Sequence, residues 1–324
     1  MTRTYAFNGD ADGLCALQQL RLAGEPMEQK DAVLVTGVKR DIALLDRVKG
    51  GEGDVCTALD ISFDLNRARV LALLAAGASV CYFDHHFAGE VPQHPSLDLH
   101  IDPSPTLCTS LIVDQYLVGR FRSWAAVGAF GDSLVDEGRA AAQAAGLDPA
   151  ATDRLRQLGL AVNYNAYGES IADLRVSPIE LAQELLPFTN PLDFAATSPT
   201  FRHLVDGFRE DMELARHLQP LHQVSGAILF LLPDAPWARR ASGTLANDLA
   251  KTHSGSAIAI VSHKTEGGYL VSVRVPRDSA VSAEAFCRRF PTGGGRRTAA
   301  GINHLPSTEL DAFAAAFEEQ FRTR

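Results

Sequence analysis

Three adjacent residues, Asp84-His85-His86, have the side-chain types that bind a metal ion and a reacting phosphate together. They follow the short apolar run Ala78 to Phe83, which has the composition of a buried strand. A strand that ends at this tripeptide would place one carboxylate and two imidazoles at the edge of a sheet. Taken alone, the tripeptide is weak evidence, because a structural origin explains it about equally well. Its weight depends on acidic residues elsewhere that end strands in the same way.

Acidic residues follow two further predicted strands. The first strand runs into Asn8-Gly9-Asp10-Ala11-Asp12-Gly13, and the third ends at Asp60. Ligands of open parallel α/β sheets bind beyond the carboxyl ends of the strands, so these groups would share one edge with Asp84-His85-His86. Neighbouring carboxylates repel one another and need a cation or a proton between them. Oxygen and imidazole ligands together suit Mn²⁺ better than Mg²⁺. Two ions about 3.5–4 Å apart are the usual clamp for phosphoryl hydrolysis.

Each of these acidic residues also has a simpler interpretation. The segment 9–13 is typical of a turn with an Asx cap, Asp60 of a cap for a helix near Ser62, and Asp132 of a turn. An EF-hand is excluded, because the sequence after Asp10 lacks a suitably spaced Glu. Only the joint occurrence of these residues favours a metal site.

The elements that must position these residues alternate between strand and helix over the first hundred residues. Apolar runs predict strands at 4–8, 32–36, 55–59 and 79–83, and helical spacing predicts helices at 14–23, 41–48 and 65–76. This alternation predicts an α/β fold with a parallel sheet covered by helices. From about residue 106 to residue 217 the spacing is helical, beginning with a helix at 106–118.

The last hundred residues predict a smaller α/β unit. Strands are expected at 227–232, 257–262 and 269–275, and helices at 242–252 and 308–321. A chain of 324 residues exceeds the usual size of a single hydrophobic core. We therefore expect a metal-binding domain at 1–190, a linker or interdomain helix at 191–220, and a second domain at 221–324.

Composition and charge narrow the classes of partner. The formal net charge of −9 argues against a broad electrostatic grip on duplex nucleic acid. It does not exclude a small phosphorylated ligand, because bound cations reverse the local field. The five cysteines are scattered without a Cys-x-x-Cys pair, which indicates a reducing compartment. The sequence has neither a signal peptide nor an apolar segment that could span a membrane, and so predicts a cytoplasmic protein without a membrane partner.

The motifs occur in an order that resembles a known family. Gly9-Asp10-Ala11-Asp12-Gly13, Asp60, Asp84-His85-His86 and Gly131-Asp132-Ser133 resemble the four ordered motifs of the DHH phosphoesterase superfamily. The stretch 104–110 is similar to the helix start after the family's third motif, and 293–301 resembles the glycine signature of the DHHA1 domain. The resemblance covers nearly the whole chain and lies nearest to the nanoRNA phosphodiesterase and RecJ-like branch. It implies a catalytic parallel-sheet domain, a smaller DHHA1 domain, and an active site in the cleft between them.

The resemblance also implies a centre of two divalent metal ions, with Mn²⁺ favoured and Mg²⁺ or Co²⁺ as alternatives. Asp10 and Asp132 would hold the first ion, and Asp12 and His85 the second. Asp60 would bridge both ions. A bridging water or hydroxide is then the expected nucleophile.

The other two residues of the tripeptide receive separate roles from the resemblance. His86 would face the substrate phosphate or the leaving group. Asp84 would accept a hydrogen bond from a ligand histidine and fix its orientation. One departure concerns the first metal: several branches have a histidine four residues before the first aspartate, where this chain has Ala6. The RecJ-like branch lacks that histidine too, and the first ion would be held less tightly.

Substrate contacts are expected from the second domain. Its glycine run would let the backbone approach a ligand closely, and the residues that follow are expected to open a helix whose amides favour anions. Arg296 stands where many DHHA1 domains have histidine, and arginine can contact a phosphate. For Arg297 a role on the solvated surface is an equally good interpretation. The expected contacts are Arg274, Gly293, Gly294, Gly295, Arg296 and Arg297.

Three functions fit these residues. We favour a Mn²⁺-dependent phosphodiesterase acting on short nucleotides: RNA of about two to five nucleotides, linear or cyclic dinucleotides, or 3′-phosphoadenosine 5′-phosphate. A 5′ single-strand exonuclease of the RecJ type is the first alternative, although such enzymes usually carry domains beyond this length. A nucleotide sensor without hydrolysis is the second, and the set of five metal ligands counts against it. Duplex DNA is not an expected partner, and a homodimer is the default for a soluble enzyme.

Overall fold

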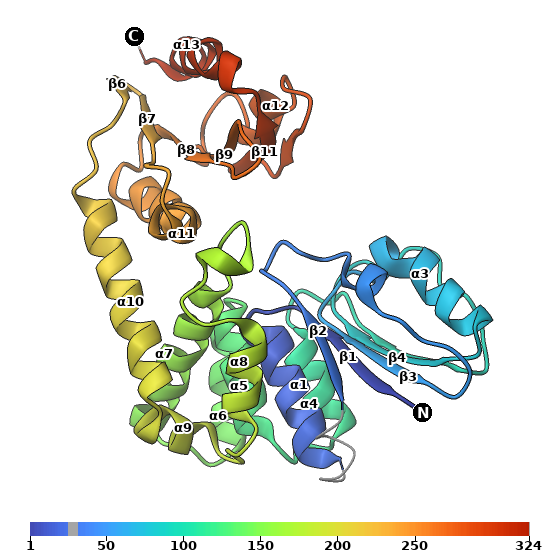
Figure 1. The fold of residues 1–324 in the computed structure, drawn as a ribbon. Coiled ribbons are helices and arrows are strands. Elements are labelled where there is room, and N and C mark those ends of the chain that lie inside the picture. The colour runs from blue at the N-terminus through green and yellow to red at the C-terminus, as the bar shows by residue number, and fades with distance from the viewer. Residues whose placement is uncertain (25–31, 324) are drawn as a thin grey trace. The chain divides into compact units, whose positions relative to one another are not determined.

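The computed structural model describes residues 1–24 and 32–323. The chain divides into two compact units, Met1–Phe208 and Arg209–Arg324. The division lies within helix α10 (Pro199–Arg216), in the stretch 191–220 that we expected to join two domains. Figure 1 shows the helices and strands of both units along the chain.

The first unit is built on a five-stranded sheet in which every neighbouring pair is parallel. The parallel sheet predicted from the sequence is therefore confirmed. Its edge strand β5 was not predicted, because Leu97, Leu99 and Ile101 alternate with polar residues over only five positions. In the order β2-β1-β3-β4-β5, the strands are β2 (Val33–Thr36), β1 (Arg3–Phe7), β3 (Val55–Leu59), β4 (Ser79–Asp84) and β5 (Leu97–Ile101).

Successive residues of the central strands point into two separate hydrophobic cores, as strand geometry requires. Tyr5 and Phe7 pack in one core, whereas Ala6 between them packs in the other. The predicted helix at 41–48 is a short 3-10 turn, η1 (Leu44–Arg47), on the second side. The first core is covered by α1 (Ala11–Ala23), α4 (Thr109–Tyr116) and α5 (Arg122–Gly131), and the second by η1 and α3 (Phe63–Ala75). Figure 1 shows α3 on the opposite side of the sheet from α1 and α4.

The remaining helices of the first unit complete the core under α1 and α5. Four of them begin with proline, and in three of these the proline follows a capping residue, Asp148, Ser177 or Asn190. No helix among residues 1–24 and 32–323 combines the length and apolar character needed to cross a membrane. These elements are α6 (Val135–Ala144), α7 (Pro149–Asn165), η2 (Ile171–Asp173), α8 (Pro178–Leu185), α9 (Pro191–Thr197) and α10.

The second unit has a six-stranded sheet in the order β10-β11-β9-β8-β7-β6, in which only β7 and β8 pair in parallel among the described strands. One face packs against aromatic residues of α12 and α13, and the other against α11. The strands are β6 (His222–Val224), β7 (Ala227–Leu231), β8 (Ala257–His263), β9 (Tyr269–Arg274), β10 (Gly293–Gly295) and β11 (Ala299–Leu305). The helices are α11 (Pro236–Thr252), α12 (Ala283–Cys287), η3 (Ser307–Glu309) and α13 (Leu310–Phe321).

The residues after the glycine run do not open a helix, so that prediction is wrong. Gly293–Gly295 form strand β10, which turns directly back into β11. Backbone packing explains the glycines: a Cβ on Gly293 would lie 1.8 Å from the carbonyl oxygen of Cys287, and Gly295 has a φ of +144°. Residues 299–305 pair with β9. Their backbone amides therefore take part in hydrogen bonds of the sheet and do not form the start of a helix, as we had expected.

Candidate metal centre

The carboxyl ends of β1, β3 and β4 bring most of the predicted ligands together in the first unit. One potential ligand atom each from Asp12, His85 and Asp132 lies within 4.8 Å of the others. The same holds for Asp60, His85 and His86. His85 belongs to both groups, so the residues from three strand ends and from the end of α5 form one cluster.

Asp12 is a buried carboxylate that caps a helix far away in the sequence. Its Oδ2 accepts a hydrogen bond from the Thr109 amide and its Oδ1 one from the Ser110 amide, both at 2.7 Å. These are the first amides of α4, which carry the positive end of the helix dipole. Each oxygen keeps a further lone pair, so these bonds fix the carboxylate in place and leave it able to bind a cation.

Asp60 is held in an unusual backbone conformation next to His85. Its φ is +57°, which costs a non-glycine residue about 1 kcal/mol. The Asp60 amide donates to the Phe83 carbonyl at 3.0 Å, and the Thr109 hydroxyl donates to Asp60 Oδ1 at 3.1 Å. Burial, together with the charges of Asp12 and Asp10, raises the pKa of Asp60 well above its usual value. A nearby divalent cation would reverse this effect.

His85 directs a ring nitrogen at the carboxylates. Its Nδ1 lies 3.1 Å from the carbonyl oxygen of Leu107, and since a carbonyl only accepts, Nδ1 carries the hydrogen. In the neutral ring, the lone pair of Nε2 then lies 3.4 Å from Asp60 Oδ1 and 3.8 Å from Asp132 Oδ2. A lone pair facing two carboxylates is unfavourable unless a proton or a metal cation lies between them. The donor set of three carboxylates and one imidazole therefore fits a divalent ion such as Mn²⁺.

Asp84 orients a different histidine from the one that we expected. Its carboxylate is fully buried and accepts from His86 Nδ1 at 2.6 Å, from the His86 amide at 3.2 Å and from the Phe63 amide at 3.1 Å. The turn after β4 brings His86 back over Asp84. The ligand histidine, His85, is instead held by the backbone carbonyl of Leu107. The hydrogen bond to Asp84 raises the pKa of His86, despite its partial burial.

Asp132 ends helix α5 and lies beside Asp12 and His85, the two residues of the second predicted metal group. Burial and the charge of Asp12 raise the pKa of Asp132 to about 6. We had paired this residue with Asp10 at the first ion, whereas its carboxylate clusters with the Asp12 carboxylate and the His85 ring. Ser133 follows with a φ of +69°, which turns the chain at the end of the helix.

Lys39 is a site residue that the sequence reasoning missed. Its ammonium pairs with Asp10, lies 3.2 Å from Asn163 Oδ1, and is 3.6 Å from Asp132 Oδ1. Burial disfavours the ionised form of Asp10, but the charge of Lys39 and the hydrogen bonds from Lys39 and the Gly13 amide together lower the pKa of that carboxyl. The sequence does indicate that Lys39 lies near the site, since Lys39 follows strand β2 and parallel strands end at one edge of the sheet. A pattern of metal ligands does not reveal this residue, because lysine is not a metal ligand.

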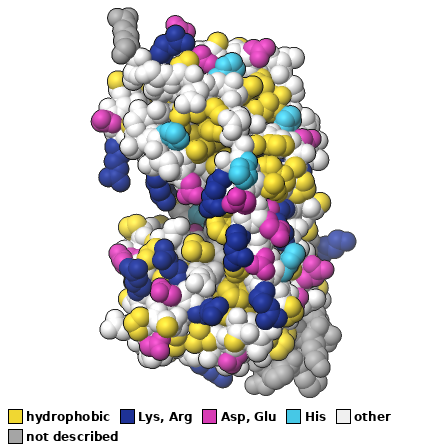
Figure 2. Space-filling view, turned by 90° about the vertical axis from the view of Figure 1, so that its left-hand side faces the viewer, with side chains coloured by type: hydrophobic (Ala, Val, Ile, Leu, Met, Phe, Trp, Pro, Cys, Tyr) yellow, Lys and Arg dark blue, Asp and Glu magenta, His cyan; other side chains and the backbone are white. Residues whose placement is uncertain are grey.

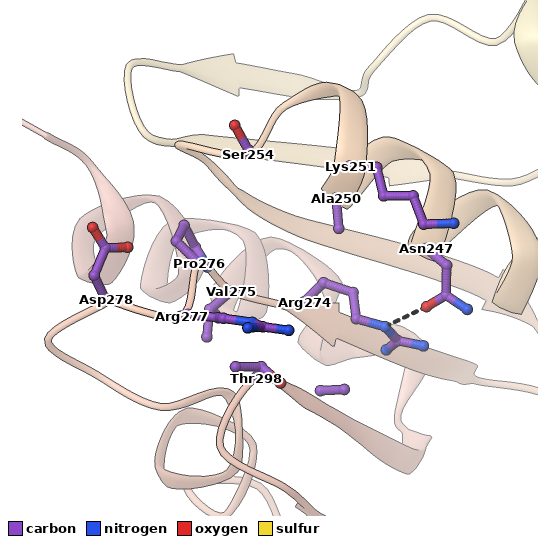
Figure 3. Close-up of a pocket in the computed structure, with 11 residues that line it drawn as sticks. Asn247, Ala250, Lys251, Ser254, Arg274, Val275, Pro276, Arg277, Asp278 and Thr298 are labelled. Atoms are coloured by element: carbon purple, nitrogen blue, oxygen red, sulfur yellow. Dashed lines mark hydrogen bonds between the residues drawn. The ribbon is translucent and has the colours of Figure 1, made fainter. Parts of the chain in front are cut away.

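The second unit contains a pocket with an excess of basic residues. Its volume is about 680 Å³, and Lys251, Arg274 and Arg277 line it together with the single acid Asp278. Arg274 Nε donates to Asn247 Oδ1 at 2.9 Å, which Figure 3 shows with the guanidinium lying beside the pocket residues of α11. This charge excess suits an anionic ligand.

The other expected substrate contacts lie elsewhere in the second unit. Arg296 and Arg297 are exposed in the turn between β10 and β11, and Arg297 donates to the Ser279 carbonyl at 3.2 Å. Gly293–Gly295 form the strand before that turn. Of the contacts expected from the sequence, Arg274 is the one that lines the basic pocket.

Comparison with known proteins identifies the architecture. Residues 223–323 match the family model of the DHHA1 domain. A solved structure described as the DHH domain of a member of a ribosomal protein family superposes with a TM-score of 0.67 at 14% identity, over 99% of this chain and 87% of that one. Residues 223–323 therefore carry a DHHA1 domain, and the chain as a whole has the fold of this solved structure. Comparison with curated proteins gave no match.

Two further solved structures similar to this chain are of proteins named RecJ. One, exonuclease RecJ bound to manganese, has a TM-score of 0.61 at 18% identity, over 98% of this chain and 89% of that one. The other, RecJ from Thermus thermophilus in complex with Mn²⁺, has a TM-score of 0.64 at 20% identity, over 98% of this chain and 51% of that one. This chain thus spans about half of the Thermus protein. At these identities the likeness concerns the fold.

Binding of Mn²⁺ to this cluster should depend on pH, because a ligand carboxyl must lose its proton. The pKa of Asp132 in the metal-free protein is about 6. Mn²⁺ should therefore bind about tenfold more weakly at pH 5 than at pH 7.5, and the raised pKa of Asp60 steepens the change. Isothermal titration calorimetry across this range measures it. Asp132→Asn serves as the comparison and should bind more weakly with a flatter profile; an equal slope in both proteins would contradict the assignment.

Proposed function

We propose that this protein is a divalent-metal-dependent phosphoesterase of the DHH type that hydrolyses short nucleotides. The observation that carries the proposal is the lone pair of His85 Nε2 facing the carboxylates of Asp60 and Asp132, with Asp12 fixed beside them by the amides of α4. A divalent ion held by these residues would supply a water of lowered pKa and would polarise a phosphoryl oxygen. Mn²⁺ is our first choice, since the donors mix oxygen and imidazole nitrogen.

His86 is the residue that we assign to proton transfer or to contact with the substrate phosphate. Asp84 holds its Nδ1 and raises its pKa, so the ring keeps a proton at higher pH than a free histidine does. A protonated imidazole beside the centre can donate to the leaving oxygen or to a non-bridging phosphate oxygen. The ring thus combines a fixed orientation with a pKa suited to an acid at neutral pH.

Short substrates fit the charge distribution better than long polymers do. The net charge is −9, and Figure 2 shows basic and acidic side chains interspersed on one face of the described part of the chain. A long nucleic acid gains affinity from many cationic contacts, whereas a dinucleotide needs few. The candidates are RNA of about two to five nucleotides, linear or cyclic dinucleotides, and 3′-phosphoadenosine 5′-phosphate. All five cysteines are free thiols, which fits action in the reducing cytoplasm.

A panel of substrates tests the proposal directly. Purified protein loaded with Mn²⁺, Mg²⁺ or Co²⁺ is incubated with each candidate, and the products are separated by chromatography. We expect Mn²⁺-dependent release of mononucleotide or phosphate from at least one short substrate. If all of them stay intact with every metal, the phosphoesterase proposal is wrong. Tight nucleotide binding without turnover would instead favour the sensor.

A 5′ single-strand exonuclease is the second candidate, because two structures of the same fold are of proteins named RecJ, one of them described as an exonuclease. The two enzymes differ in how the rate depends on length. Processive degradation of long single-stranded DNA, with little activity on dinucleotides, would choose the exonuclease. Faster hydrolysis of dinucleotides than of long strands would choose the short-substrate enzyme.

Replacing Arg274 with Ala should weaken substrate binding more than catalysis. Its guanidinium lines the basic pocket and is oriented by Asn247. Loss of one charge-assisted contact to a phosphate is worth about 1.5 kcal/mol or more, so KM should rise about tenfold while kcat changes less than about twofold. Steady-state kinetics measures both. Arg288→Ala is the matched control, since Arg288 is exposed in the same unit and pairs with Glu284. An unchanged KM in Arg274→Ala would remove the pocket from the proposal.

A further inference from the structure

The Lys39 ammonium lies in a site built for a cation. It donates to the carboxylate of Asp10 and, at 3.2 Å, to the Asn163 side-chain oxygen, and it forms an ion pair with Asp132 Oδ1 at 3.6 Å. The chain at Lys39 is anchored as well: its amide donates to the Ala166 carbonyl at 3.0 Å, and its carbonyl accepts from Asn8 at 3.2 Å. The ammonium is thereby held among the same acids that would bind a metal.

Asp10 has little left to offer a metal ion. As the cap of α1, its Oδ1 accepts from the amides of Asp12 at 3.0 Å and Gly13 at 3.1 Å. Its Oδ2 pairs with Lys39. Ala6 in strand β1 stands where several branches of the resembled family have a histidine, and its methyl group cannot bind a metal ion. An ion at Asp10 would therefore share one carboxylate oxygen with an ammonium group.

The other ligands of the cluster meet at His85. Asp12 and Asp132 group with this ring, and Asp60 groups with it and with His86. Nε2 of His85 lies 3.4 Å from Asp60 Oδ1 and 3.8 Å from Asp132 Oδ2, so three carboxylates and one imidazole nitrogen remain for an ion away from Asp10. One divalent ion together with Lys39 brings three positive charges to the four carboxylates of the cluster. A second divalent ion beside Lys39 would be repelled by its ammonium.

We propose that Lys39 takes the place of one of the two metal ions expected of a DHH centre, so that this chain binds a single divalent ion. The lysine acts as a built-in cation at Asp10, and the divalent ion is held by Asp12, Asp60, His85 and Asp132. This inference deepens the proposed function and rests on it for the reaction. Its test reads metal number and needs no substrate.

The test counts Mn²⁺ per chain by calorimetry and by elemental analysis, and reads electron paramagnetic resonance of the bound Mn²⁺. The natural protein should bind one ion and give the spectrum of an isolated Mn²⁺. The double variant Ala6→His/Lys39→Met, which removes the ammonium and supplies an imidazole, should bind two ions with a spin-coupled spectrum. Lys39→Arg keeps the charge and should bind one. Lys49→Ala is the matched control at an exposed lysine of the same unit and should also bind one.

The outcomes separate this inference from the proposed function. Two spin-coupled ions in the natural protein would overturn the role of Lys39 and leave the phosphoesterase proposal standing. Failure of the natural protein to bind Mn²⁺, Mg²⁺ or Co²⁺ would overturn both. A single ion in a folded Ala6→His/Lys39→Met variant would show that the lysine is not what limits the metal number. Should that variant not fold, the stoichiometry and spectrum of the natural protein still decide the matter.

Discussion

Replacing Asp60 with Asn should lower kcat/KM at least about a thousandfold without unfolding the protein. The carboxylate lies 3.4 Å from His85 Nε2 in the middle of the cluster, so its loss removes a charged ligand from the proposed ion. Asparagine tolerates the left-handed backbone at φ +57°, and its amide oxygen can still accept from the Thr109 hydroxyl. Kinetics with saturating Mn²⁺, metal analysis and circular dichroism measure activity, metal content and fold.

The same substitution should stabilise the metal-free protein. The pKa of Asp60 is raised well above its usual value by burial and by Asp12 and Asp10, so at neutral pH its ionised form opposes folding. The neutral amide removes that penalty, and Tm in the presence of a chelator should rise. Asp60→Ala is the comparison. It also removes the metal ligand, but alanine has no polar side chain that stabilises the backbone at a positive φ. Wild-type activity in Asp60→Asn would disprove the central position of this carboxylate.

The sheet and most of the acidic cluster could be predicted from the sequence because one physical rule links them. Apolar runs that end in Asp10, Asp60 and Asp84 predict parallel strands, and parallel strands place their carboxyl ends at one edge. The rule predicts that these residues lie close together, but it does not predict where their side chains point. It fails for Leu97–Ile101, whose alternation of apolar and polar residues over five positions is too short a signal.

Details within the cluster could not be predicted, because they depend on side-chain direction and on segments remote in the sequence. That Asp84 bonds His86 and leaves His85 to the Leu107 carbonyl is decided by the turn after β4. The capping of α4 by Asp12 joins residues about a hundred positions apart. A glycine run likewise gives no indication of whether a ligand or the Cys287 carbonyl requires its bare backbone, and here the carbonyl does.

Asp84→Asn should reduce kcat about a hundredfold to a thousandfold through the orientation of His86. The carboxylate accepts three hydrogen bonds, including one from His86 Nδ1 at 2.6 Å. In Asp84→Asn an amide nitrogen, which donates, replaces one carboxylate oxygen, which accepts. His86 must then change its tautomer or turn away, as happens when the aspartate of a catalytic triad is replaced by asparagine. The mismatch is fully buried and should also cost about 1–3 kcal/mol of stability.

The pH profile separates this positioning role from a merely structural one. The hydrogen bond to Asp84 is the main cause of the raised pKa of His86. If the protonated ring is the active form, activity is lost as pH rises through that pKa, and the loss should move to lower pH in Asp84→Asn. Asp98→Asn is the matched control, because Asp98 pairs with His100 at 3.0 Å on the neighbouring strand and is exposed. It should leave both kcat and the profile unchanged. A lower kcat in Asp84→Asn with an unchanged pH profile would mean that Asp84 has only a structural role. A carboxylate that raises the pKa of His86 cannot be neutralised without shifting the titration of His86.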